Sequence, residues 1–62
     1  MKPVNIRWTN PYGFRYMEWA AVIGMKVLKP EGLPSRPVFH VKYPDGFEDY
    51  IPVSDKTNYE IR

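Results

Sequence analysis

The chain contains no cysteine and a single histidine, and each shortage removes a class of site. Without cysteine no disulfide can form, and one histidine cannot supply the ligands of a conventional zinc site. We therefore expect no metal and no cofactor. In a chain of 62 residues the core is small, because domains below ~70–80 residues rarely gain more than ~3–5 kcal/mol from it. The aromatic content of 16% is the expected compensation, and the chain is expected to be a monomer or a weak homodimer.

Long apolar runs and a strong excess of one charge are also missing. No apolar stretch approaches the ~20 residues that a membrane span requires, and residues 1–5 lack the apolar core of a signal peptide. These features predict a cytoplasmic protein without a membrane partner. Nine basic and seven acidic residues leave a net charge of +2, which is a weak electrostatic signal for a protein dedicated to nucleic acid.

Four turn-forming sequences divide the chain into stretches rich in β-branched and aromatic residues. The turns lie at residues 10–13, 30–32, 44–46 and 54–56. The stretches that they separate are residues 3–8, 18–28, 36–43, 47–53 and 59–62. Five short strands at this spacing predict one all-β domain over residues 1–62, a small barrel with room for a short 3-10 turn before the last strand. Asp45-Gly46 between two apolar runs is a strong hairpin signal.

Alternation along each strand predicts its buried face, because successive side chains point to opposite sides of a sheet. In each of the five strands, nearly every second residue is apolar, and these positions define the expected buried face. The expected inward set is Val4, Ile6, Trp8, Trp19, Ala21, Ile23, Met25, Val27, Phe39, Val41, Tyr43, Phe47, Ile51, Val53, Tyr59 and Ile61. Asp49 breaks the pattern of its strand, and a β-bulge there would turn it outward.

A helix is the alternative for residues 11–29. Asn10 would cap it, Pro11 would take its first position and Pro30 would end it. Most of its surface would be apolar, however, and so small a chain has too little else to cover it. Val22 and Val27 also favour strand. We therefore expect a strand here.

Several segments of the chain resemble parts of Tudor domains. Trp19-Ala20-Ala21-Val22-Ile23 is similar to their second strand, and residues 38–43, 45–46 and 51–55 are similar to their third and fourth. The resemblance implies a five-stranded SH3-like barrel. In ligand-binding Tudor domains an aromatic cage holds a methylated side chain, and the similar positions here are Trp8, Trp19, Tyr43 and Phe47. Phe47 stands where those domains often place an asparagine.

The same aromatic residues are expected to meet without any appeal to a family. Trp8 ends the first predicted strand, Trp19 begins the second, Tyr43 ends the third and Phe47 begins the fourth. In an antiparallel meander these four positions lie at one end. We name this cluster the aromatic end. Two interpretations stay open for it: a binding surface, or plain core packing.

The loop of residues 9–17 is expected to overhang the aromatic end. It carries Tyr12, Phe14 and Tyr16, and the barrel does not need the two tyrosines for its core. An exposed aromatic ring can anchor a protein interface, attract a cation or stack on a nucleobase.

No arrangement in the sequence resembles a catalytic nucleophile and its base, because Ser35 and Ser54 lie in turns and His40 faces outward. We therefore expect a non-catalytic module that recognises a protein partner or peptide segment. The residues expected to bind it are Trp8, Tyr12, Tyr16, Trp19, Tyr43 and Phe47. The alternative is a nucleic-acid-binding module that contacts phosphates through a basic outer face. That face would consist of Arg7, Lys26, Arg36, His40 and Lys42.

Overall fold

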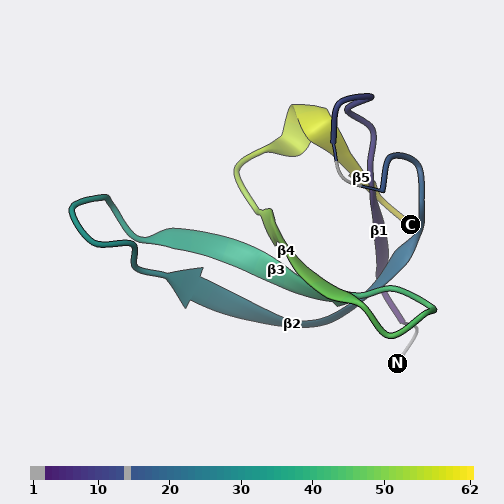
Figure 1. Cartoon of the computed structure of the whole chain (residues 1–62), viewed down its shortest axis with the longest axis horizontal. Helices are drawn as coiled ribbons and strands as arrows, with labels where there is room; N and C mark the ends of the chain where they lie inside the picture. Colours follow the sequence, from purple (N-terminus) through teal and green to yellow (C-terminus); the bar gives the residue numbers. More distant parts are fainter. Residues whose placement is uncertain (1–2, 14) are drawn as a thin grey trace.

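The computed structural model describes residues 3–13 and 15–62 and contains five antiparallel strands in one sheet (Figure 1). The elements are β1 (Asn5–Trp8), β2 (Ala20–Leu28), β3 (Arg36–Lys42), β4 (Glu48–Pro52), the 3-10 helix η1 (Lys56–Asn58) and β5 (Tyr59–Ile61). Across the sheet the strand order is β4-β3-β2-β1-β5. The all-β prediction and the short 3-10 turn before the last strand are confirmed, and the helical alternative for residues 11–29 is wrong. Over the described residues the sheet is not closed into a barrel.

The hairpin between β3 and β4 forms where the sequence predicted it. The N–H of Gly46 donates to the carbonyl of Tyr43 at 2.9 Å, and the N–H of Tyr43 donates to the carbonyl of Phe47 at 2.8 Å. Gly46 has a φ of +94°, a conformation that glycine adopts without a steric cost. The Asp45 carboxylate accepts the N–H of Phe47 at 3.1 Å, which stabilises the turn from within.

The core is a small cluster drawn from the first four strands and the residue after β3. It consists of Ile6, Ala20, Val41, Tyr43 and Ile51, with Trp8, Val22, Phe39 and Tyr59 packed around it. The Phe39 and Tyr59 rings meet edge to face at a centroid distance of 5.8 Å. This geometry is favourable for two aromatic rings and holds β5 against β3.

The predicted inward face of β2 is wrong in its first half. Ala20 is buried and Val22 packs on the core, so Trp19 and Ala21 point to the opposite, outer face. Val22 pairs with Val41, but the next pair is Gly24 with His40, which leaves Ile23 as an extra residue in a β-bulge. Because a bulge shifts the alternation by one residue, a single pattern cannot describe both halves of β2.

The bulge expected at Asp49 is also absent. Asp49 lies opposite Val41 in an uninterrupted register between β3 and β4, which places it on the same side of β4 as Ile51. It is half-buried at the margin of the core, and its carboxylate accepts the N–H of Tyr50 at 2.8 Å. Phe47 and Ile61, expected inside, are largely exposed.

Beyond its short pairing with β1, β2 continues with β3 as an arm, residues 23–37, that extends away from β1 and β5 (Figure 1). β4 pairs with β3 from Val38 onward, so only the outer part of the arm has two strands. At the base of the arm Val38 is buried on the outer side of β3. Lys26 is its register partner on β2. The Lys26 Nζ reaches β4, where it donates to the Tyr50 hydroxyl at 3.3 Å. An aliphatic lysine stem covers apolar surface while its ammonium stays in water.

Candidate binding surfaces

The loop of residues 9–17 is fixed at both ends, to η1 and to β1. The N–H of Thr9 donates to the carbonyl of Asn58, and the N–H of Met17 donates to the carbonyl of Trp8, each at 2.8 Å. Met17 and Arg15 have φ values of +62° and +55°, which are uncommon for residues other than glycine. Arg15 and Met17 are therefore held in place by contacts that outweigh this local cost.

Arg15 holds the loop against the aromatic end. Its guanidinium carbon lies 4.6 Å from the ring centroid of Tyr43 and 4.8 Å from that of Phe47. It also forms ion pairs with Asp45 at 2.7 Å and Glu18 at 3.2 Å. Two aromatic rings and two carboxylates thus surround one cation of the chain itself, and we name this arrangement the Arg15 clamp.

The contacts of the Arg15 clamp shift the pKa values of three of its residues. The hydrogen bond from Arg15, followed by that from the N–H of Phe47, lowers the pKa of Asp45 below its ordinary value. The same hydrogen bond raises the pKa of Arg15. Burial, followed by the negative field of Asp49, raises the pKa of Tyr43. Asp45 and Arg15 therefore stay charged, and Tyr43 stays neutral, over the ordinary pH range.

Only part of the predicted aromatic end comes together. Tyr43 and Phe47 are neighbours at a ring-centroid distance of 6.0 Å, and Trp8 packs against the same core. Trp19 lies on the outer face instead. The Tyr43 side chain is only 2% exposed, so it cannot offer a free ring face on the side of the clamp.

The two loop tyrosines are directed to solvent. Tyr12 is 96% exposed and Tyr16 is 50% exposed. The turn that carries Tyr12 is ordered by Asn10, whose side-chain oxygen accepts the N–H of Tyr12 at 3.0 Å. Both rings are therefore available for contact. Phe14 lies outside the described residues.

Trp19 lies beside two arginines. Its ring centroid is 4.5 Å from the guanidinium carbon of Arg7 and 4.2 Å from that of Arg62. Arg62 did not belong to the predicted basic set. Its position follows from β5 pairing with β1, where Asn5 and Arg62 exchange backbone hydrogen bonds of 3.1 and 2.9 Å. The order of the strands in the sheet, which the turn pattern does not give, was the missing information.

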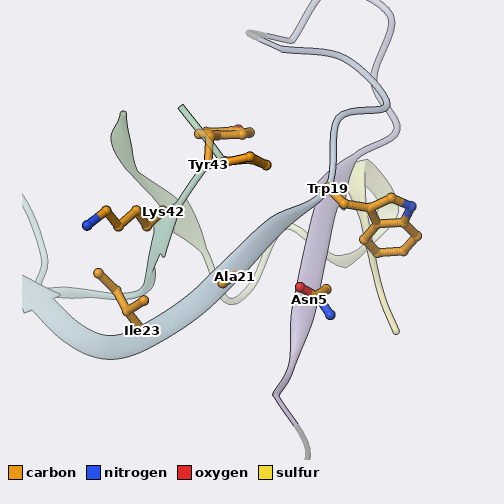
Figure 2. Close-up of a pocket in the computed structure, with 7 residues that line it drawn as sticks. Asn5, Trp19, Ala21, Ile23, Lys42 and Tyr43 are labelled. Carbon is orange, nitrogen blue, oxygen red and sulfur yellow. The ribbon is translucent and has the colours of Figure 1, made fainter. Parts of the chain in front are cut away.

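A pocket of about 350 Å³ opens on the outer face beside Trp19 (Figure 2). Asn5 and Lys42 are the register partners of Ala21 on β1 and β3, so the three form a row across the sheet. Ala21, with the smallest side chain of the three, lies at the middle of this row. Trp19, the residue before β2, and Ile23, on β2, lie on either side of it along the chain (Figure 2). We name this hollow the Ala21 pocket; its lining residues are Asn5, Trp19, Ala21, Ile23, Lys42, Tyr43 and Pro44.

Much of the predicted basic face is paired with acidic or aromatic neighbours. Arg7 forms an ion pair with Glu60, and the Nε2 of His40 lies 2.7 Å from a Glu48 carboxylate oxygen. Lys26 lies over the Tyr50 ring at 5.4 Å.

Within the part of the chain that the structure describes, Lys42 and Arg36 have no ion-pair partner. Lys42 lines the Ala21 pocket. Arg36 lies at a second, more polar pocket of about 610 Å³ that Asp55 also lines.

Compared with models of known protein families, with curated proteins and with solved structures, the chain shows no match. Over residues 3–13 and 15–62 no cluster of histidine and acidic side chains is arranged to hold a metal ion. In the same residues no helix has the length and apolar character to span a membrane.

Proposed function

We propose that this protein is a non-catalytic binding module that recognises a segment of a protein partner, and that the Ala21 pocket receives a side chain of that segment. The pocket carries the proposal, because it joins apolar walls to a few polar groups that can fix the orientation of a ligand. Trp19 and Ile23 supply the walls, and Lys42 and Asn5 supply the polar groups.

The sheet supports the further proposal that the fold is an open form of the SH3-like, Tudor-like barrel. β1 pairs with both β2 and β5, the remaining strands follow in chain order, and η1 precedes β5. The Arg15 clamp then takes the place of an external ligand at Tyr43 and Phe47. For this reason we assign partner recognition to the outer side of Trp19 and to the exposed Tyr12 and Tyr16, rather than to an empty cage.

Filling the pocket tests the proposal directly. The Ala21→Leu variant adds apolar bulk at the centre of the pocket and removes no other group, and Thr57→Leu adds a comparable change on exposed η1. Peptides selected from a displayed random library against the wild-type protein should bind Thr57→Leu normally. They should bind Ala21→Leu at least about tenfold more weakly, which corresponds to about 1.4 kcal/mol. Peptides that bind Ala21→Leu as tightly as the wild type would exclude the pocket.

A second candidate, binding of single-stranded nucleic acid, rests on the partly exposed Trp19 ring and on two basic side chains without an ion-pair partner in the described residues, Lys42 and Arg36. A base can stack on an indole while lysine and arginine contact phosphates. Titration with mixed-sequence DNA and RNA at low and moderate salt separates the two functions, since phosphate binding weakens steeply with salt. We expect no salt-sensitive amide shifts. Such shifts over residues 36–43, lost in the Lys42→Ala and Arg36→Ala variants, would replace the protein-binding proposal.

A further inference from the structure

The arm leaves one edge of β2 without a neighbouring strand. β1 pairs with β2 only at Ala20 and Ala21, and one further hydrogen bond joins the N–H of Val22 to the carbonyl of Val4 at 2.9 Å. From there to Leu28, β3 occupies the other edge of β2. Within the described residues, the backbone groups of residues 23–28 that point away from β3 therefore face no strand (Figure 1).

An apolar surface runs beside this open edge. Met25 pairs with Phe39, and Val27 pairs with Pro37, so the inward side of the sheet continues past the core onto the arm. Met25 is 62% exposed and Val27 is 57% exposed. An exposed, apolar strand edge is a template for pairing with a further strand.

The charge of the arm favours an acidic occupant. Residues 23–37 contain Lys26, Lys29 and Arg36 but only one acidic residue, Glu31. Lys26 contacts Tyr50 and no carboxylate among the described residues. Antiparallel pairing of β2 with β2 of a second copy would bring the lysines of both chains to one seam, and like charges across strands are destabilising. A second copy of β2 is therefore a poor occupant.

We propose that an extended segment of a protein partner adds to the sheet along residues 23–28 of β2, with alternating apolar and acidic side chains. Its backbone pairs with the open edge, as in other cases of strand addition. Its apolar side chains cover Met25 and Val27, and its acidic side chains lie beside Lys26 on the opposite face. This inference goes beyond the proposed function, because it uses the edge of the arm, which shares only Ile23 with the lining of the Ala21 pocket.

The test uses the full chain, labelled with ¹⁵N, and two blocked peptides that alternate valine with glutamate or valine with lysine. The valine–glutamate peptide should shift the amide resonances of residues 23–28 and slow their hydrogen exchange, while the valine–lysine peptide should do neither. Lys26→Glu should weaken the binding of the glutamate peptide roughly fivefold, as expected for reversing one cross-strand charge pair. Lys56→Glu makes the same charge change on exposed η1 and should bind nearly as the wild type does.

Three results would overturn the inference. These are absence of protection at residues 23–28 with the glutamate peptide, equal binding of both peptides, and self-association of the protein alone that protects the same amides. The two proposals fail separately. Ala21→Leu blocks the pocket and leaves residues 24–28 of the edge unchanged, whereas Lys26→Glu changes the arm and leaves every residue that lines the pocket in place.

Discussion

Two tyrosine hydroxyl groups in this protein have opposite surroundings. The hydroxyl of Tyr43 is buried and has no hydrogen-bond partner among the described residues. The hydroxyl of Tyr59 donates to the carbonyl of Val53 at 2.6 Å and ties β5 to the segment after β4. An unpaired buried polar group is costly, whereas a paired one contributes modestly to stability. The same chemical change at these two residues should therefore have opposite effects.

We expect Tyr43→Phe to raise the free energy of unfolding by up to about 1 kcal/mol and Tyr59→Phe to lower it by about 1 kcal/mol. Urea unfolding followed by fluorescence measures both changes, with each variant serving as the control for the other. A clear loss of stability in Tyr43→Phe would mean that its hydroxyl has a partner, such as an ordered water.

The Tyr43→Phe variant should also change how stability depends on pH. Burial raises the pKa of Tyr43 in the folded protein, so the neutral form is favoured by folding. The resulting stability is complete below the unfolded pKa of about 10 and is lost as the pH rises through the folded pKa. Tyr43→Phe should remove this alkaline loss.

At the scale of elements, turn chemistry predicted where the strands lie, because it acts locally, but it did not determine whether the sheet closes into a barrel. Asp45 and Gly46 form the expected hairpin, and all five strands lie within their predicted ranges, each shorter by one or two residues. The phase of β2 was not predictable in the same way, since the bulge at Ile23 arises from pairing with β3. The role of Arg15 was also missed, because its contact with Asp45 spans 30 positions in sequence and leaves no local pattern.

The glycines of two elements offer a matched prediction. Gly46 has a positive φ, so Gly46→Ala should cost about 1–2 kcal/mol of stability. Gly24 lies in β2 at an ordinary φ, and a Cβ there would meet nothing within 4 Å, so Gly24→Ala should be neutral or stabilising by up to about 1 kcal/mol. Chemical unfolding measures both. Equal losses would show that the strand beside the bulge needs glycine as much as the turn does.

At the scale of the whole molecule, many large apolar side chains are exposed to solvent. Its fully buried core rests on a few side chains, while the arm carries exposed Ile23, Met25, Val27, Leu28 and Leu33. Apolar side chains that remain exposed contribute little to the stability of the fold. Their exposure is consistent with the two proposals, in which one side of the sheet receives a side chain and the edge of the arm receives a strand.

So small a core makes the whole fold sensitive to a single truncation. Ile51→Ala should cost about 2–5 kcal/mol, which equals most of the ~3–5 kcal/mol that a domain of this size draws from its core. We therefore expect Ile51→Ala to be largely unfolded at 25 °C, by far-UV circular dichroism and by the collapse of amide chemical-shift dispersion. Ile61→Ala, at a side chain that is 51% exposed on short β5, should remain folded. A well-dispersed spectrum for Ile51→Ala would mean that contacts outside this core stabilise the protein. Because association adds stability in proportion to the logarithm of concentration, a melting temperature that rises with protein concentration would identify those contacts as intermolecular.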